Sequence, residues 1–116
     1  MNNFYRSVIL FLLLITNIFA IDETEYDPIN SVDCIILKDE NSIICKYIHR
    51  RIDMDKYVEF RWIDPTGTIS RQRTMQIPAG HGSIYDYRFI NGRVTGTWTF
   101  EVLDDNKSYK TNFIIE

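Results

Sequence analysis

Short runs in which bulky apolar residues alternate with polar ones recur along the chain and set the strongest limit on its fold. In VEFRW, Val58, Phe60 and Trp62 alternate with charged residues, and in TWTFEV, Trp98 and Phe100 alternate with polar ones. Because successive side chains point to opposite faces of a β-strand, this pattern predicts strands that bury one face. No segment keeps a helical period over three turns. The chain is therefore predicted to be all-β.

Turn residues divide the pattern into seven expected strands. Asp64-Pro65-Thr66-Gly67 suits a type I turn, and Asn91-Gly92 is a tight-turn signal. Strands that are half buried need a second sheet to cover them, so we expect a seven-stranded antiparallel two-sheet sandwich, with a small barrel as the alternative. The run 68–77 is mostly polar and is expected to be an edge strand, protected by Arg71 and Arg73. The expected strands are 32–38, 42–49, 56–64, 68–77, 83–90, 95–103 and 108–115.

Residues 1–20 have the composition of a secretory signal peptide. Arg6 precedes an apolar stretch, and Ala20 is a small residue at the expected cleavage position. The continuous apolar run is shorter than the roughly 20 residues of a membrane span, although an uncleaved anchor remains the alternative. Residues 21–31 turn acidic and are predicted to be a flexible linker, which leaves one domain at 32–116.

Export and charge together limit the compartment and the partner. The periplasm is favoured and the extracellular medium is the alternative; both are oxidising, and disulfides persist there. The chain has 13 Lys and Arg against 16 Asp and Glu, for a net charge of −3. This acidic balance argues against nucleic acid or an anionic membrane as the main partner, because both require clustered positive charge.

The two cysteines are placed symmetrically about the polar tetrad KDEN. A hairpin centred on that tetrad puts Cys34 opposite Cys45 and Asp33 opposite Lys46. Directly opposed residues are close enough for a disulfide, which we therefore expect. A redox pair would need Cys-x-x-Cys spacing, and a zinc site lacks ligands because the chain has two histidines. Two reduced, buried thiols remain the alternative.

Several basic residues are candidates for a binding surface. Planar guanidinium groups suit a carboxylate or a sulfate, whereas the alternative is a solvated surface balanced by nearby acids. The candidates are His49, Arg50, Arg51, Arg71, Arg73 and His81, with Arg88 and Arg93 as further members of a basic face.

No reaction or cofactor is expected. His81 lies in the Gly-flanked loop PAGHGS, where a general base could be placed, but the chain has no Gly-x-Ser-x-Gly nucleophile motif. Asp53, Asp55 and Asp64 lack the regular spacing of a calcium loop. We therefore expect no catalytic residue, no metal and no cofactor.

The orientation of the strand 83–90 decides the role of its aromatic residues. Tyr85, Tyr87 and Phe89 share one side, and we expect that side to face the core. If Asp86 and Arg88 were the buried side instead, the three rings would form an exposed platform of the kind that stacks on sugars.

With these motifs in view, the stretch 55–116 resembles the immunoglobulin-like or fibronectin-III-like modules of exported bacterial proteins. In such modules an aromatic-x-Trp strand, an Asp-Pro-x-Gly turn and a terminal Gly-x-Trp-x-Phe-x-Val hairpin recur. The resemblance implies a sandwich fold and a role as a spacer, adaptor or binding surface. Both cysteines lie in one predicted hairpin here, so an intersheet disulfide is not expected. The matching residues are Phe60, Trp62, Asp64, Pro65, Gly67, Gly96, Trp98, Phe100, Val102 and Phe113.

A narrower resemblance concerns Asn106. The segment DDNKS fits the extended bacterial N-glycosylation pattern, with an acid at −2 and Ser at +2. We expect Asn106 at an exposed hairpin tip, as a candidate glycan acceptor. The alternative is a plain polar turn.

Two function classes remain. The first is a non-enzymatic exported interaction or structural module, an accessory component of a cell-envelope assembly that docks a protein partner by a sheet edge or the basic loops. The alternative is a small secreted ligand-binding or enzyme-inhibitory protein that uses loops 49–55 and 78–82. The first predicts a flat surface with an exposed apolar patch, and the second predicts a concave pocket with convergent polar groups.

Overall fold

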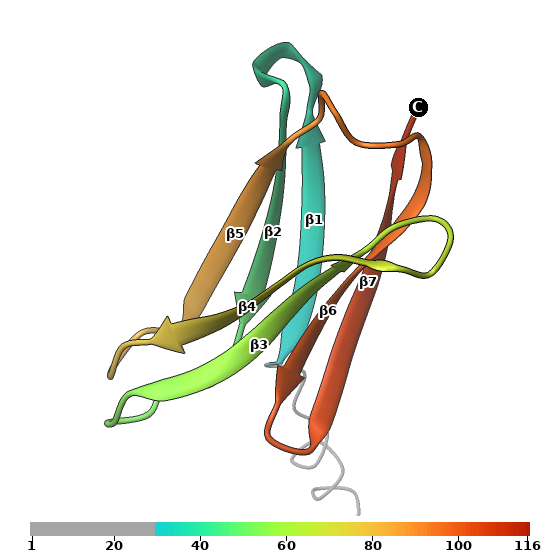
Figure 1. Ribbon diagram of the computed structural model, residues 1–116. Coiled ribbons are helices and arrows are strands. Elements are labelled where there is room, and N and C mark those ends of the chain that lie inside the picture. The colour runs from blue at the N-terminus through green and yellow to red at the C-terminus, as the bar shows by residue number, and fades with distance from the viewer. Residues whose placement is uncertain (1–29) are drawn as a thin grey trace, which may run out of the picture.

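The computed structural model describes residues 30–116, and these residues form an all-β fold (Figure 1). The signal peptide predicted for 1–20 and nearly all of the linker predicted for 21–31 lie outside the described residues. Every strand boundary lies within one residue of its predicted position. The strands are β1 (Ser31–Leu37), β2 (Ser42–Ile48), β3 (Lys56–Ile63), β4 (Ile69–Ile77), β5 (Ser83–Phe89), β6 (Gly96–Asp104) and β7 (Lys107–Ile115), with a 3-10 turn η1 (Lys38–Glu40) between β1 and β2.

The strands form two antiparallel sheets, with the order β1-β2-β5 in one and β4-β3-β6-β7 in the other (Figure 1). The prediction that residues 68–77 form an edge strand is confirmed, because β4 lies at the end of the four-stranded sheet. The Asn91-Gly92 turn connects β5 to β6, so here the tight turn carries the chain between sheets and does not close a hairpin.

The inner faces of the two sheets enclose one shared core, as expected of a sandwich. Tyr47 from β2 and Phe60, Trp62, Trp98 and Phe100 from the four-stranded sheet are all at most 2 % exposed. The Phe100 ring meets the Phe60 and Trp62 rings edge to face, with centroids 5.0 and 5.2 Å away. Such pairs contribute about 0.5–1.5 kcal/mol each beyond the area they bury. The alternating aromatic residues thus account for the packing of the two sheets.

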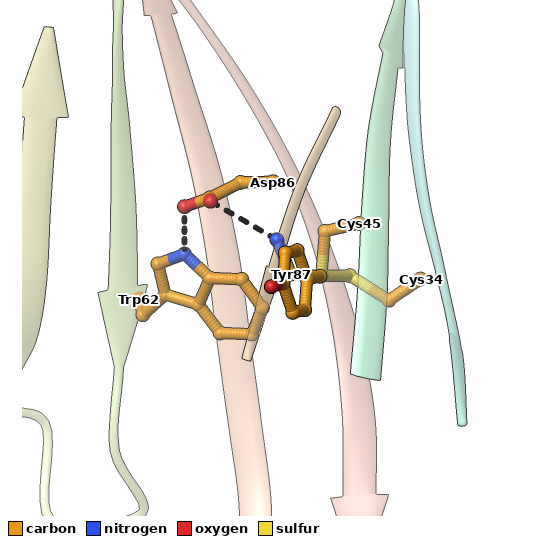
Figure 2. Close-up of a disulfide and its surroundings, with 5 residues drawn as sticks. All are labelled: Cys34, Cys45, Trp62, Asp86 and Tyr87. Carbon is orange, nitrogen blue, oxygen red and sulfur yellow. Dashed lines mark hydrogen bonds between the residues drawn. A yellow bond between two sulfur atoms is a disulfide. The ribbon is translucent and has the colours of Figure 1, made fainter. Parts of the chain in front are cut away.

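The predicted cysteine hairpin is confirmed. Cys34 pairs with Cys45 across β1 and β2, Asp33 pairs with Lys46, and the two cysteines form a disulfide. Asn41 closes the turn in the left-handed region at φ 51°, a conformation that Asn tolerates better than most residues. The disulfide lies on the inner face, where Cys45 is fully buried and belongs to the core (Figure 2).

The predicted orientation of β5 is wrong. Tyr85, Tyr87 and Phe89 are 62, 53 and 56 % exposed, whereas Asp86 and Arg88 are 5 and 8 % exposed. The physical reason is that the inner side of β5 faces the Trp62 indole and the arginines of β4, which satisfy a buried carboxylate. Buried charges are tolerated when they are paired and hydrogen-bonded.

Candidate functional site

Four arginines surround a pocket of about 240 Å³ between the β4 and β5 edges. The pocket has four guanidinium groups and one carboxylate, a formal charge of +3, in a chain whose net charge is −3. Positive charge is therefore concentrated here against the overall balance of the protein. We call this site the arginine pocket; it is lined by Arg71, Arg73, Asp86, Tyr87, Arg88, Phe89 and Arg93.

Asp86 is the central hydrogen-bond acceptor of the arginine pocket. The Trp62 indole Nε1 donates to Asp86 Oδ2 at 3.0 Å, and the backbone N–H of Tyr87 donates to Oδ1 at 3.0 Å (Figure 2). Arg73 Nη1 donates to Oδ1 at 2.9 Å, and Arg71 Nη1 lies 3.4 Å from Oδ2. These contacts hold a carboxylate from β5 against two guanidinium groups from β4, so they also join the edges of the two sheets.

Arg88 is the most buried arginine of the pocket. Its Nη1 donates to Ser70 Oγ at 3.0 Å, and its Cζ lies 5.4 Å from the centroid of the Trp62 ring. Its Nε is buried and has no hydrogen-bond partner among residues 30–116. Burial, together with repulsion from Arg93 and Arg71, lowers the pKa of Arg88 to about 10, and Asp86 opposes the shift. The pocket thus has too little negative charge for its cations.

Side chains also cap part of the β5 edge. Arg71 Nη1 lies 3.4 Å from the Tyr87 carbonyl oxygen, and Arg93 Nε donates to the Phe89 carbonyl oxygen at 3.3 Å. The Tyr87 N–H is engaged by Asp86. An added strand would need these backbone groups. This stretch of the β5 edge is therefore closed to strand addition.

The outer face of the β1-β2-β5 sheet carries many apolar side chains, and its charged residues Asp33 and Lys46 lie opposite each other in the strand register. In the strand register Tyr87 lies beside Ile44, which lies beside Ile35, so one row of the sheet is apolar across all three strands. The outer face of the other sheet instead carries Glu59 and Arg61, which form an ion pair. Exposed apolar groups are normal singly but signal an interaction when they are contiguous. We call this surface the aromatic face; its residues are Ile35, Ile44, Ile48, Tyr85, Tyr87 and Phe89.

The predicted basic residues fall into two groups. Arg71 and Arg73 lie in the arginine pocket, together with Arg88 and Arg93. The remaining four belong to loops 49–55 and 78–82, which meet where Gly80 N donates to the Ile52 carbonyl at 2.8 Å. There Arg51 Nη1 donates to the Gly80 carbonyl at 2.8 Å. In this second group His49 is buried, while Arg50, Arg51 and His81 are exposed.

Two of the three aspartates considered for calcium, Asp55 and Asp64, have structural roles. Asp64 Oδ1 accepts hydrogen bonds from Thr66 and Thr68 at the turn after β3, and these bonds lower the pKa of Asp64. Asp55 accepts from the Ala79 N–H and from Gln76. Within residues 30–116, no three His, Cys, Asp or Glu residues are grouped so that they could hold a metal ion.

A second polar cluster joins the two sheets near the β6–β7 hairpin. The Tyr47 hydroxyl donates to Asp104 Oδ2 at 2.6 Å, and Lys56 Nζ lies 2.7 Å from Asp104 Oδ1. Asn30 donates to the Tyr47 oxygen at 2.9 Å. Asn106 is exposed at the neighbouring hairpin tip, as a glycan acceptor must be, and its modification stays a prediction.

This cluster should make the protein lose stability in alkaline solution. Burial, with Asp104 adding to it, raises the pKa of Tyr47, and the hydrogen bond to Asp104 raises the pKa of Lys56. Above about pH 10 the unfolded chain loses these protons while the folded protein keeps them, so the free energy of unfolding falls by about 1.4 kcal/mol per pH unit per group. Urea unfolding of wild type and Tyr47→Phe between neutral pH and pH 11 should show a shallower decline in the variant. Equal slopes would contradict this account.

Searches found no matching protein-family model and no matching curated protein. In the part of the chain that the structure describes, no helix is long and apolar enough to cross a membrane.

Proposed function

We propose that this chain is a non-enzymatic exported interaction module of the cell envelope, which docks a protein partner on its aromatic face. The observation that carries the proposal is the apolar row of Ile35, Ile44 and Tyr87 on the outer surface of the β1-β2-β5 sheet, with the exposed Tyr85 and Phe89 on either side of Tyr87 along β5. Interface hot spots are enriched in Tyr and Arg, and here the exposed Tyr87 lies beside four arginines. Export is supported by the Cys34–Cys45 disulfide, which suits an oxidising compartment.

The strand order supports the resemblance to immunoglobulin-like modules. In constant-type immunoglobulin domains the first, second, fourth and fifth strands form one sheet, and the third, sixth and seventh form the other. Here β4 pairs with β3 instead of β5, and the sheet assignment is otherwise the same. We therefore propose an immunoglobulin-like or fibronectin-III-like sandwich as the scaffold of the aromatic face.

The partner is a protein whose contact surface places an anionic group beside apolar side chains. The argument is charge complementarity: the aromatic face borders the arginine pocket along β5, and Tyr87 and Phe89 belong to both. Apolar contact would supply the affinity, and the neighbouring cations would orient the partner.

The second candidate, a binder that uses loops 49–55 and 78–82, has less support. Polar groups of these loops bond to each other: Arg51 to the Gly80 carbonyl, Gly80 N to the Ile52 carbonyl, and Asp55 to Ala79 N. Groups engaged in such internal bonds are not free to converge on a ligand. We infer that the two loops have a structural role and close one end of the sandwich.

Substituting the exposed tyrosines should weaken partner capture without unfolding the protein. Tyr85→Ser/Tyr87→Ser removes two exposed rings, and we expect affinity to fall at least about tenfold because interface tyrosines are frequent hot spots. The melting temperature should change little, because the rings are exposed. The measurement is crosslinking and pulldown from native envelope, followed by titration calorimetry with the purified partner.

The matched control is Tyr57→Ser, which removes a tyrosine that is 61 % exposed on β3, outside the aromatic face. This variant should capture the same partner in the same amount as wild type. Equal capture by the double variant would overturn the proposal. So would a protein that captures nothing, or one that forms a dimer through this face in sedimentation.

A further inference from the structure

We propose that the arginine pocket binds one tetrahedral oxyanion, a sulfate or phosphate group. The pocket is a distinct site with its own walls, contributed by β4, β5 and the β5–β6 turn. Its four guanidinium groups have one internal counter-charge, Asp86, which is already engaged by Arg71 and Arg73. A second anion would balance the cations that Asp86 leaves over.

The donor geometry favours a tetrahedral group. Arg71 and Arg73 come from β4, Arg88 from β5 and Arg93 from the following turn, so guanidinium groups reach the pocket from three elements. A guanidinium has five N–H donors. The hydrogen bonds described above engage a single nitrogen of each: Nη1 of Arg71, Arg73 and Arg88, and Nε of Arg93. Sulfate and phosphate present oxygens in several directions, whereas a carboxylate presents two in one plane.

The buried state of Arg88 is a second, independent observation. Arg88 is 8 % exposed, it lines the pocket, and its Nε has no hydrogen-bond partner among residues 30–116. The depressed pKa of its guanidinium reflects burial and repulsion from Arg93 and Arg71. An anion in the pocket would relieve this repulsion. The site thus has the electrostatic character of an anion-binding site.

The place of the pocket indicates how such a group would arrive. Tyr87 and Phe89 line the pocket and also belong to the aromatic face. A partner seated on the aromatic face would therefore bring its anionic group to the arginines. This last step rests on the proposed function, whereas binding of the free ion does not.

The test is an NMR titration of the ¹⁵N-labelled protein, which follows resonances of the pocket directly. Trp62 Nε1–H bonds to Asp86 inside the site, so its indole resonance reports on the pocket. Titration with inorganic sulfate or phosphate at constant ionic strength should move this resonance and the amides of residues 86–93 saturably at millimolar concentration. Acetate should bind at least about tenfold more weakly. Low concentrations matter, because sulfate at high concentration stabilises any protein by exclusion from its surface.

Arg93→Gln is the variant of choice, since Arg93 is only partly buried and its side chain makes one described hydrogen bond. It should weaken sulfate and phosphate about tenfold or more, because bonds between charged groups are the strong ones. Arg50→Gln removes an arginine outside the pocket and should bind like wild type. An absent or non-saturable response, or equal losses in both variants, would overturn the anion site. Saturable ion binding without partner capture would overturn the docking proposal alone.

Discussion

Removing the Cys34–Cys45 disulfide should cost about 3 kcal/mol of unfolding free energy, because the bond closes a loop between residues 11 apart and restricts the unfolded chain. For a domain of this size that corresponds to a fall in melting temperature of about 10–20 °C. The change is Cys34→Ala/Cys45→Ala, and the measurement is calorimetry under non-reducing conditions. A cost of this size is large against the typical total stability of about 5–15 kcal/mol.

Reduction of the wild-type protein distinguishes the contribution of the S–S bond to stability from the contribution of core packing around the sulfur atoms. Cys45 is fully buried, so its replacement by Ala also leaves a small void in the core. Adding a reductant breaks the bond and keeps both sulfur atoms, so the melting temperature of wild type should fall while that of the double variant should not. If Cys34→Ser melts like wild type without a reductant, the disulfide contributes nothing to stability.

The parts of the fold that the sequence predicted well are those governed by local pattern. The alternation around Phe60 and Trp62 placed β3 because bulky and charged residues separate cleanly there. The symmetry around the KDEN turn placed Cys34 opposite Cys45, since a one-residue slip would have turned every side chain to the wrong face. Residue type and spacing predict a strand correctly where both favour the same orientation of its side chains.

The orientation of β5 could not be predicted in this way. Its two faces carry three aromatic residues on one side and Asp86 with Arg88 on the other, and burial by residue type favours the aromatic side. What reverses the preference is the β4 edge, whose Arg71 and Arg73 lie beside β5 although the two strands belong to different sheets. The arginine pocket forms where the β4 edge lies beside β5. The one signal in the sequence was the unusual pairing of an acid and a base on a single strand face.

Replacing Asp86 should destabilise the protein more than any other single change in the arginine pocket. Asp86→Ala leaves the buried Trp62 N–H without its acceptor and the partly exposed Arg71 and Arg73 without their carboxylate, and the loss of these bonds should cost about 2–3 kcal/mol. Urea unfolding measures the loss. Asp33→Ala is the matched control: Asp33 is exposed on the outer side of β1, and its loss should change stability by less than about 0.5 kcal/mol.

Two further measurements tie this loss to uncompensated charge. Asp86→Leu/Arg88→Met removes the buried acid together with the most buried cation of the pocket, and it should recover part of the stability because less uncompensated buried charge remains. Asp86→Ala should also gain more from millimolar phosphate than wild type does, since its pocket has lost the internal counter-charge and holds four guanidinium groups. If Asp86→Ala unfolds like wild type, or phosphate stabilises both proteins equally, the carboxylate does not offset the arginines. In that case the buried acid would act only as a hydrogen-bond acceptor for the Trp62 indole.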